Sequence, residues 1–352
     1  MTDTIPADAL RAYAAALLRA AGLAADRADT VADVLVEGDL LGHDTHGLAQ
    51  LPGYLGALAN GTMAATGEPQ AVADRGAAVL WDGGRLPGPW LVVQAIGLAT
   101  GRARQHGTGT VVIRRSHHIA CLAAYAERVA RQGMVMLLAS SDPSVASVAP
   151  HGGTRALMTP NPLAAGFPTG GAAGDDPVIM DISTSTTTNG LTGRLHREGR
   201  LLDHPWLLDA AGQPSRDPAV LFTDPPGTIL PLGGRDSGHK GYALGLLVEA
   251  LTAGLGGFGR ADPAEGWGAA VFLQVLDPAA FGGADAFVRQ TRWLADAAQG
   301  VPPVPGGPPV RLPGGRGLER KRAAAADGLR LHPSILPGLA PWAERFRVDA
   351  PA

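Results

Sequence analysis

Apolar residues recur at helical spacing through the first part of the chain. Residues 7–21 form one amphipathic stripe that ends at Gly22, and residues 26–40 form a second. A third helix is predicted to begin after Asp44-Thr45, since either side chain can cap it. The first stripe consists of Leu10, Tyr13, Ala14, Leu17 and Leu18. The chain therefore opens with a small helical unit.

Runs rich in branched and aromatic residues follow, and helical stretches separate them. Strands are predicted over residues 78–83, 110–116, 134–141, 177–184 and 269–277. Helices are predicted over residues 88–106, 119–132, 240–254 and 283–299. The Pro- and Gly-rich segment 300–316 is typical of an extended surface crossing. The class is therefore α/β or α+β, with helices at both ends of the chain around a sheet.

Composition excludes several classes of protein. The chain has 352 residues, of which 45% are hydrophobic, and a formal net charge of −3, so neither intrinsic disorder nor dedicated nucleic-acid binding is expected. A single cysteine, Cys121, excludes a disulfide framework and a multi-cysteine metal site. The acidic N-terminus does not resemble a signal peptide, and every long apolar run carries a charge. We expect a cytoplasmic protein with no membrane partner.

One glycine-rich sequence resembles a dinucleotide-binding fingerprint. Residues 254–259 read GLGGFG, but they follow a predicted helix and precede a loop. The fingerprint instead needs a strand before the glycines and a helix after them, so that the helix N-terminus meets the pyrophosphate. Residues 254–259 therefore predict a helix exit, and not a Rossmann site.

The segment His43-Asp44-Thr45-His46-Gly47 is rich in chemically active side chains. Two imidazoles three residues apart can share a helix face and bind a metal. Alternatively, His46 at a helix N-terminus is suited to proton transfer near pH 7, with Thr45 orienting it. The plainest interpretation is helix capping with surface histidines.

Three further segments carry polar groups next to predicted elements. Ser116-His117-His118 ends a predicted strand, where side chains project into clefts. Asp181 begins a hydroxyl-rich tract and is placed to orient an imidazole. Lys240, one of only two lysines in the chain, lies between glycines before a predicted helix and suits an anion. Ordinary helix starts and solvated turns also account for these segments.

Taken together, these segments resemble the malate/L-lactate dehydrogenase-like oxidoreductases that are distinct from the Rossmann-type enzymes. This family also includes ureidoglycolate dehydrogenase, 2,3-diketo-L-gulonate reductase, sulfolactate dehydrogenase and Δ1-piperideine-2-carboxylate reductase. The matching segments occur in family order, between about residues 7 and 325. They are GDLLGHDTHGLAQLPGYL (38–55), SHHIACLAAYAERVARQG (116–133), MTPNPLAAGFP (158–168), VIMDISTS (178–185), LLDAAGQPSRDP (207–218), SGHKGYALGLLVEALTAGLGG (237–257) and VRLPGGRGLERK (310–321).

The resemblance implies a fold and an assembly. The fold is a mixed α/β, non-Rossmann NAD(P)-binding architecture with a large, mainly antiparallel sheet wrapped by helices, and the enzyme works as a homodimer. We expect residues 1–70 to form a helical segment that packs with residues 300–352, and residues 71–299 to form a domain that binds cofactor and substrate.

The resemblance also implies site residues. Thr45-His46 matches the family's Ser-His pair, whose histidine donates or accepts a proton. His118 matches a histidine beside the substrate and nicotinamide, and Asp181 matches the relay aspartate. The positions implied near the cofactor are Ser141, Asn161, Asp181, Ile182, Ser183, His239, Lys240, Pro313, Gly314 and Gly315. No metal is expected.

The sequence departs from the family pattern at the substrate. Members of the family often have an arginine four residues after the histidine that corresponds to His46. Here that position is Gln50, which offers a neutral amide in place of a cationic guanidinium group. His117, Ile119-Ala120 and Gly315 replace other usual residues of the matching motifs. Gln50 and His118 are thus the expected substrate contacts, and the substrate carboxylate requires another holder.

The sequence predicts an NAD(P)-dependent oxidoreductase of a small 2-hydroxy or 2-oxo acid, with NAD favoured over NADP. One alternative is reduction of a cyclic ketimine carboxylate, where the histidine protonates nitrogen. A second is a metal-dependent hydrolase or lyase, whose ligands would be His43, His46, His117 and His118. A third is a non-catalytic binding module that keeps the fold.

Overall fold

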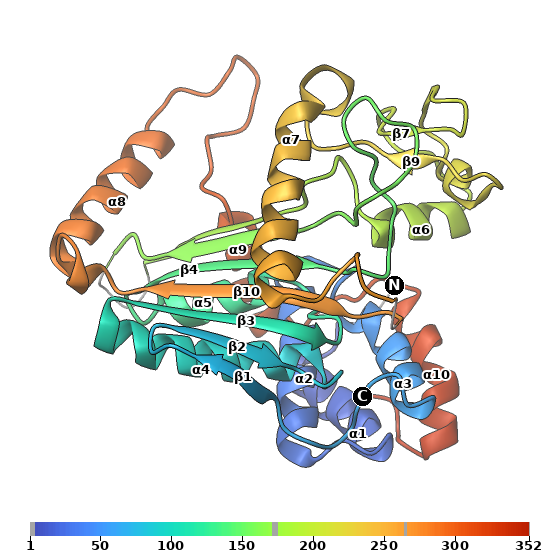
Figure 1. Ribbon diagram of the computed structural model, residues 1–352, viewed down its shortest axis with the longest axis horizontal. Helices are drawn as coiled ribbons and strands as arrows, with labels where there is room; N and C mark the ends of the chain where they lie inside the picture. The colour runs from blue at the N-terminus through green and yellow to red at the C-terminus, as the bar shows by residue number, and fades with distance from the viewer. Residues whose placement is uncertain (1–3, 171–174, 264–265, 352) are drawn as a thin grey trace.

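The computed structural model describes residues 4–170, 175–263 and 266–351, and a large sheet lies at its centre (Figure 1). Its strands are β1 (Gln70–Asp74), β2 (Ala78–Asp82), β3 (Thr108–Ser116), β4 (Val135–Ser141), β5 (Leu163–Phe167), β6 (Val178–Ile182) and β10 (Ala269–Leu276). A small sheet contains β7 (Leu207–Leu208), β8 (Pro214–Ser215) and β9 (Thr228–Ile229). The α-helices are α1 (Ala7–Ala20), α2 (Ala25–Leu40), α3 (Leu51–Ala59), α4 (Gly88–His106), α5 (Ala123–Ala130), α6 (Asn189–Arg197), α7 (Gly234–Glu249), α8 (Ala284–Gln299), α9 (Gly315–Asp327) and α10 (Ile335–Phe346).

The large sheet is mainly antiparallel. Its strand order is β1-β2-β3-β10-β4-β5-β6, and only the β2–β3 pair among these neighbours is parallel. The late strand β10 enters between β3 and β4, where Leu273 lies opposite both Val111 and Leu138. The predicted mixed α/β fold with a large, mainly antiparallel sheet is confirmed.

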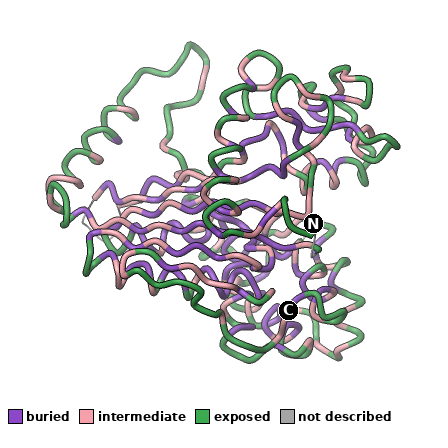
Figure 2. The backbone as a smooth tube through the Cα atoms, viewed as in Figure 1, coloured by how far each residue is buried: buried purple, intermediate pink, exposed green. Residues whose placement is uncertain are grey.

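Helices cover both faces of this sheet. Helices α4 and α5 pack on one face, whereas α7 and the π-helical turn Ala250–Gly254 pack on the other. Successive strand residues point to opposite faces, so Val111 and Ile113 join the main core while Val112 joins a smaller cluster with Val248. Figure 2 shows that the central strands are largely buried, whereas the edge strand β1 is exposed.

The two ends of the chain meet beside the sheet. Helix α10 packs on α1 and α3, and α9 packs on α2. One hydrophobic cluster joins residues of these helices, such as Leu10 and Leu339, with Val111 of the sheet. The division into residues 1–70 with 300–352 and a separate domain over 71–299 stays a prediction.

Most predicted elements form close to the predicted bounds, but the third helix is an exception. Residues 44–46 form turns, a 3-10 turn spans Leu48–Gln50, and α3 begins only at Leu51. The backbone N–H of Leu48 donates to Asp39 Oδ2 at 2.7 Å, so a carboxylate from α2 serves the group that Asp44 or Thr45 was expected to cap. The prediction that His46 lies at an α-helix N-terminus is therefore wrong.

Several other features differ from the patterns. The strands β1 and β5 and the helix α6 were not predicted, and α5 is shorter than residues 119–132. Helices were expected at the C-terminal end without bounds, and they form as α9 and α10. The segment 301–314 contains no helix or strand, as expected, and leads into α9. Among the described helices, none combines the length and the apolar character needed to cross a membrane.

Candidate active site

A cavity of about 440 Å³ lies where several segments of the chain meet. The loop after α2 contributes His46, the segment between β3 and α5 contributes His118, β6 contributes Asp181, and the start of α6 contributes Gly190. Trp267, just before β10, completes the wall. Segments far apart in sequence thus bring all four predicted catalytic residues, Thr45, His46, His118 and Asp181, to one concave surface.

His46 is oriented by its chain neighbour. Thr45 Oγ1 lies 2.8 Å from His46 Nδ1, and the two rings of His46 and His118 have centroids 6.0 Å apart. Burial lowers the pKa of His46, and the carboxylates of Asp181 and Asp44 partly oppose that shift. His46 is therefore a neutral imidazole at pH 7, able to accept a proton.

His118 is held by Tyr54, a residue that the sequence analysis did not single out. The Tyr54 hydroxyl lies 3.0 Å from His118 Nδ1 and donates to the His118 carbonyl at 2.9 Å. The backbone N–H of Ala120 also lies within hydrogen-bond distance of Nδ1, at 3.3 Å, which favours the tautomer that carries its proton on Nε2. Burial lowers the pKa of His118 well below its usual value. His118 thus offers an N–H donor.

His117 belongs to the core. Its side chain is fully buried, with ring centroids 5.7 Å from Tyr54 and 4.8 Å from Trp267. Burial and the charge of Arg85 lower the pKa of His117 to about 3. The adjacent histidines therefore separate, with His118 on the cavity wall and His117 in the packing behind it.

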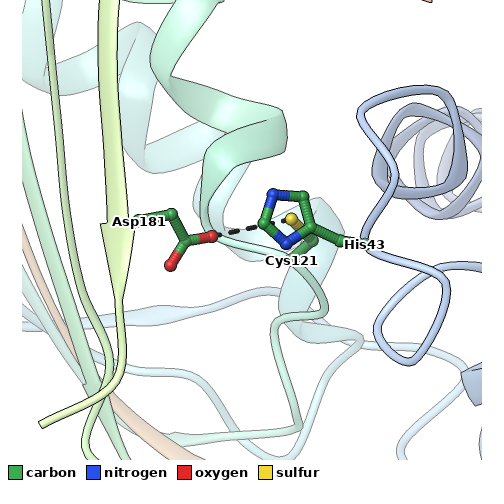
Figure 3. A group of neighbouring side chains, drawn as sticks. All are labelled: His43, Cys121 and Asp181. Atoms are coloured by element: carbon green, nitrogen blue, oxygen red, sulfur yellow. Dashed lines mark hydrogen bonds between the residues drawn. The ribbon is translucent and has the colours of Figure 1, made fainter. Parts of the chain in front are cut away.

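The structure does not assemble the four-histidine metal site. Within the described ranges, the one group able to hold a metal is His43, Cys121 and Asp181 (Figure 3). Asp181 Oδ2 accepts from the Ala123 backbone N–H at 2.8 Å and from Cys121 Sγ at 3.6 Å. Asp181 acts on His46 through charge, as its effect on the pKa shows.

One side of the cavity contains Gln50 and the N-terminus of α6. The Gln50 amide donates to the Thr45 carbonyl at 2.6 Å. This bond joins Gln50 to the histidine loop, which we define as residues 43–47. A Cβ atom added to Gly190 would lie 3.6 Å from His46 Cε1, so the first turn of α6 directly adjoins the imidazole. Arg194, one turn along α6, forms an ion pair of 2.9 Å with Asp44.

Two predicted cofactor residues belong to a network that the sequence did not indicate. Ser141 Oγ donates to Glu249 Oε1 at 2.9 Å, and Asn161 Nδ2 donates to the same oxygen at 3.0 Å. Arg260 pairs with this carboxylate at 2.8 Å. Ser141 lines the cavity, whereas Asn161 is fully buried behind it. Glu249 lies within an otherwise apolar helical run, which was the available signal.

A second cavity, of about 480 Å³, adjoins the first, since His43 and Asp181 line both. Ile182, Pro313 and Gly314 line this second cavity. Its wall carries three arginines, Arg311, Arg316 and Arg320.

The close approach of Gly314 explains its residue type. The backbone of Gly314 has φ +83°, and an added Cβ would lie 2.6 Å from Ile179 Cβ. Gly315, the neighbouring predicted cofactor residue, begins α9 beside this cavity.

The remaining predicted cofactor positions are divided between the first cavity and an exposed helix. Ser183 lines the first cavity and donates to the Ser185 carbonyl at 3.0 Å. His239 and Lys240 are exposed on α7, outside the residues that line either cavity. The other lysine, Lys321, bridges Glu37 at 2.6 Å and Glu127 at 2.8 Å.

The protein thus combines a mainly antiparallel, non-Rossmann sheet with a cavity lined by two imidazoles. Comparison with known proteins identifies the class that shares this architecture. The family model described as malate/L-lactate dehydrogenase matches residues 5–340. The L-lactate dehydrogenase of Cupriavidus necator is 34% identical over 346 residues, 97% of each chain. The Δ1-pyrroline-2-carboxylate/Δ1-piperideine-2-carboxylate reductase of Pseudomonas syringae pv. tomato is 33% identical over 317 residues, 86% of each chain.

Solved structures agree. The crystal structure of Δ1-piperideine-2-carboxylate reductase from Pseudomonas syringae superimposes with a TM-score of 0.84 and 30% identity, covering 97% of this chain and 100% of that one. The protein belongs to the malate/L-lactate dehydrogenase family. It is an oxidoreductase that acts on CH–OH or C=N groups with a nicotinamide cofactor.

Proposed function

We propose that this protein interconverts a small 2-hydroxy acid and its 2-oxo acid, with His46 as the proton donor and acceptor. The observation that carries the proposal is the pairing of His46 and His118 on one cavity wall, with ring centroids 6.0 Å apart. Thr45 and Asp181 act on His46, by hydrogen bond and by charge respectively.

The two histidines have different tasks in this proposal. Neutral His46 accepts the hydroxyl proton during oxidation and returns it during reduction. His118 donates its Nε2–H to the substrate oxygen, because Ala120 already donates to Nδ1. Tyr54 fixes the ring plane of His118.

The substrate carboxylate needs a holder other than an arginine at position 50. The first turn of α6 supplies backbone N–H groups and the positive end of the helix dipole next to His46. The amide of Gln50 lies on the same cavity surface. We assign the carboxylate to the N–H groups of Asn189 and Gly190, with Gln50 beside them.

The residues of the two adjoining cavities fit a nicotinamide dinucleotide. Three arginines in the second cavity provide the positive charge that phosphate groups require, and Asp181 lies at the junction with the first. When bound, the nicotinamide supplies or accepts the hydride. The chain's own residues orient the substrate and move the proton. We expect NAD in preference to NADP.

The proposal includes a homodimer in the cytoplasm. Helix α8 projects from the body in Figure 1, and only Ala295 among its residues is buried. Trp293 and Leu294 are 67% and 61% exposed, which supports a second copy covering this helix.

A second candidate is reduction of a cyclic ketimine carboxylate. The relative with that printed activity is 33% identical over 86% of this chain, and its structure superimposes over nearly the full length. In this case His46 would protonate the imine-derived nitrogen instead of an alkoxide oxygen. The same cavity would hold the carboxylate.

The test measures cofactor binding and turnover in turn. Titration with NADH and NADPH should quench the fluorescence of some of the six tryptophans, and 2-oxo acids and cyclic imines should then be screened for oxidation of the reduced cofactor. We expect His46→Asn to lower kcat by about 10²–10⁴-fold with binding retained. His204→Gln, an exposed histidine outside the cavity, is the matched control. Binding of neither nucleotide would refute the proposal.

A further inference from the structure

Three side chains of different chemistry converge beside the proposed proton-transfer site. They are His43 from the loop after α2, Cys121 from the segment before α5, and Asp181 from β6 (Figure 3). One ligand atom from each, a ring nitrogen, the thiol sulfur and a carboxylate oxygen, all lie within 4.8 Å of one another. Cys121 Sγ and Asp181 Oδ2 are already in contact at 3.6 Å.

This geometry is close to that of a metal site. Zn²⁺ binds thiolate sulfur at ~2.3 Å and imidazole nitrogen or carboxylate oxygen at ~2.0–2.2 Å, so tetrahedral ligand atoms lie roughly 3.3–3.8 Å apart. The three side chains therefore reach a common ion after small rotations. Cys121 is 2% exposed, yet it lines the first cavity, which provides an entry path.

We propose that His43, Cys121 and Asp181 bind one Zn²⁺ ion, and that the bound ion inhibits the enzyme by occupying the carboxylate beside His46. The thiol proton passes to solvent when the Zn–S bond forms. One thiolate and one carboxylate balance the charge of Zn²⁺, and the neutral imidazole completes three ligands, so the buried site carries no net charge. The fourth position faces the cavity.

A bound ion would change the electrostatic environment of His46. Asp181 raises the pKa of His46 through its negative charge, and a bound cation removes that effect.

The binding test does not depend on turnover. Cd²⁺, a spectroscopic substitute for Zn²⁺, gives an ultraviolet thiolate-to-metal charge-transfer band when it binds sulfur. Because the chain has a single cysteine, any such band reports Cys121 alone. We expect one equivalent of Cd²⁺ to saturate the band in the full-length protein, and Zn²⁺ to compete it away.

Variants define the ligand set. We expect Cys121→Ser to abolish the band and His43→Ala to weaken binding by at least about tenfold. His204→Gln, outside the cluster, should bind as the wild type does. No band in the wild type, or a band that His43→Ala leaves unchanged, would overturn the site.

The inhibitory part rests on the proposed function, and it is measured separately. Zn²⁺ should lower wild-type turnover with the same concentration dependence as its binding, and a chelator should restore it. Each variant is compared with its own metal-free activity, and Cys121→Ser should lose sensitivity. Binding without inhibition, or activation by Zn²⁺, would refute the inhibitory role. Failure of turnover in metal-free protein would concern only the proposed function.

Discussion

Single buried side chains determine the geometry of the histidine loop. Asp39 of α2 is 6% exposed, and its Oδ2 accepts the Leu48 N–H at 2.7 Å beneath the loop. A Cβ atom at Gly47 would lie 2.3 Å from this carboxyl group, so only glycine permits the close approach. Burial raises the pKa of Asp39 to about 7. Tyr54 has the corresponding role beneath His118.

The raised pKa of Asp39 makes stability depend on pH. The unfolded chain releases this proton near pH 3.8 and the folded protein near 7, so the contribution of Asp39 to stability is full below about pH 4 and declines as pH rises to about 7. We expect Asp39→Asn to gain about 1–4 kcal/mol relative to the wild type between pH 4 and pH 8. Denaturant unfolding at both pH values measures this difference. An equal difference at the two values would contradict the shifted pKa.

Removal of the Tyr54 hydroxyl tests how His118 is held. Tyr54→Phe takes away the contacts to His118 Nδ1 and to its carbonyl, and it should cost about 1–3 kcal/mol of stability. We expect kcat to fall by roughly tenfold with little change in cofactor affinity, because the ring loses one orienting bond and retains that from Ala120. Steady-state kinetics and thermal unfolding provide the measurements. Tyr13→Phe in α1 is the control, and an unchanged kcat in Tyr54→Phe would remove its positioning role.

At the scale of elements, one ion pair joins the helix α7 to the loop that lines the cavity. Arg260 pairs with Glu249 at the end of α7, and it also donates to the carbonyls of Val145 at 2.7 Å and Asp142 at 3.0 Å. Asp142 and Val145 line the cavity. The Arg260 guanidinium group therefore links helix α7, which covers the sheet, to the loop that shapes the cavity.

Arg260→Met should lower the stability of the protein and also loosen the loop that lines the cavity. We expect a loss of about 1–3 kcal/mol in stability, since a largely buried carboxylate loses its partner, and a rise in substrate KM as the 142–145 loop loosens. The double variant with Glu249→Gln should be less destabilised than the sum of the single variants. Additive losses would show that the two residues stabilise the protein independently.

At the scale of the whole molecule, α8 and the segment that follows it expose several large apolar side chains. Helix α8 is strongly amphipathic, yet Trp293, Leu294 and Val304 remain exposed. Exposed apolar surface of this kind is typical of an interaction site, and it supports the proposed homodimer.

A charge on α8 tests the proposed homodimer. Trp293→Lys should shift the protein from dimer toward monomer in light scattering, because a lysine ammonium would be desolvated in the interface. Leu201→Lys, at an apolar residue that is 56% exposed and lies outside α8, should leave the mass unchanged. A wild-type protein that is monomeric would refute the dimer directly.

The sequence by itself determined many of the helices and strands, and the family. Regular apolar spacing predicted α1, α2, α4, α8 and the central strands, because the helical and strand periods are local properties of the chain. The order of the motifs around His46, His118 and Asp181 indicated the family, and the match to the family model confirms this assignment.

Only the tertiary structure decided which side chains meet. Tyr54 and His118 are 64 residues apart, and Asn161 and Glu249 are 88 apart. The burial that lowers the histidine pKa values arises when these segments close around the cavity. The local spacing of apolar residues determines which face of a helix or strand is buried, but not which other segment packs against that face. The contacts that shift the histidine pKa values therefore follow from the packing of the whole chain.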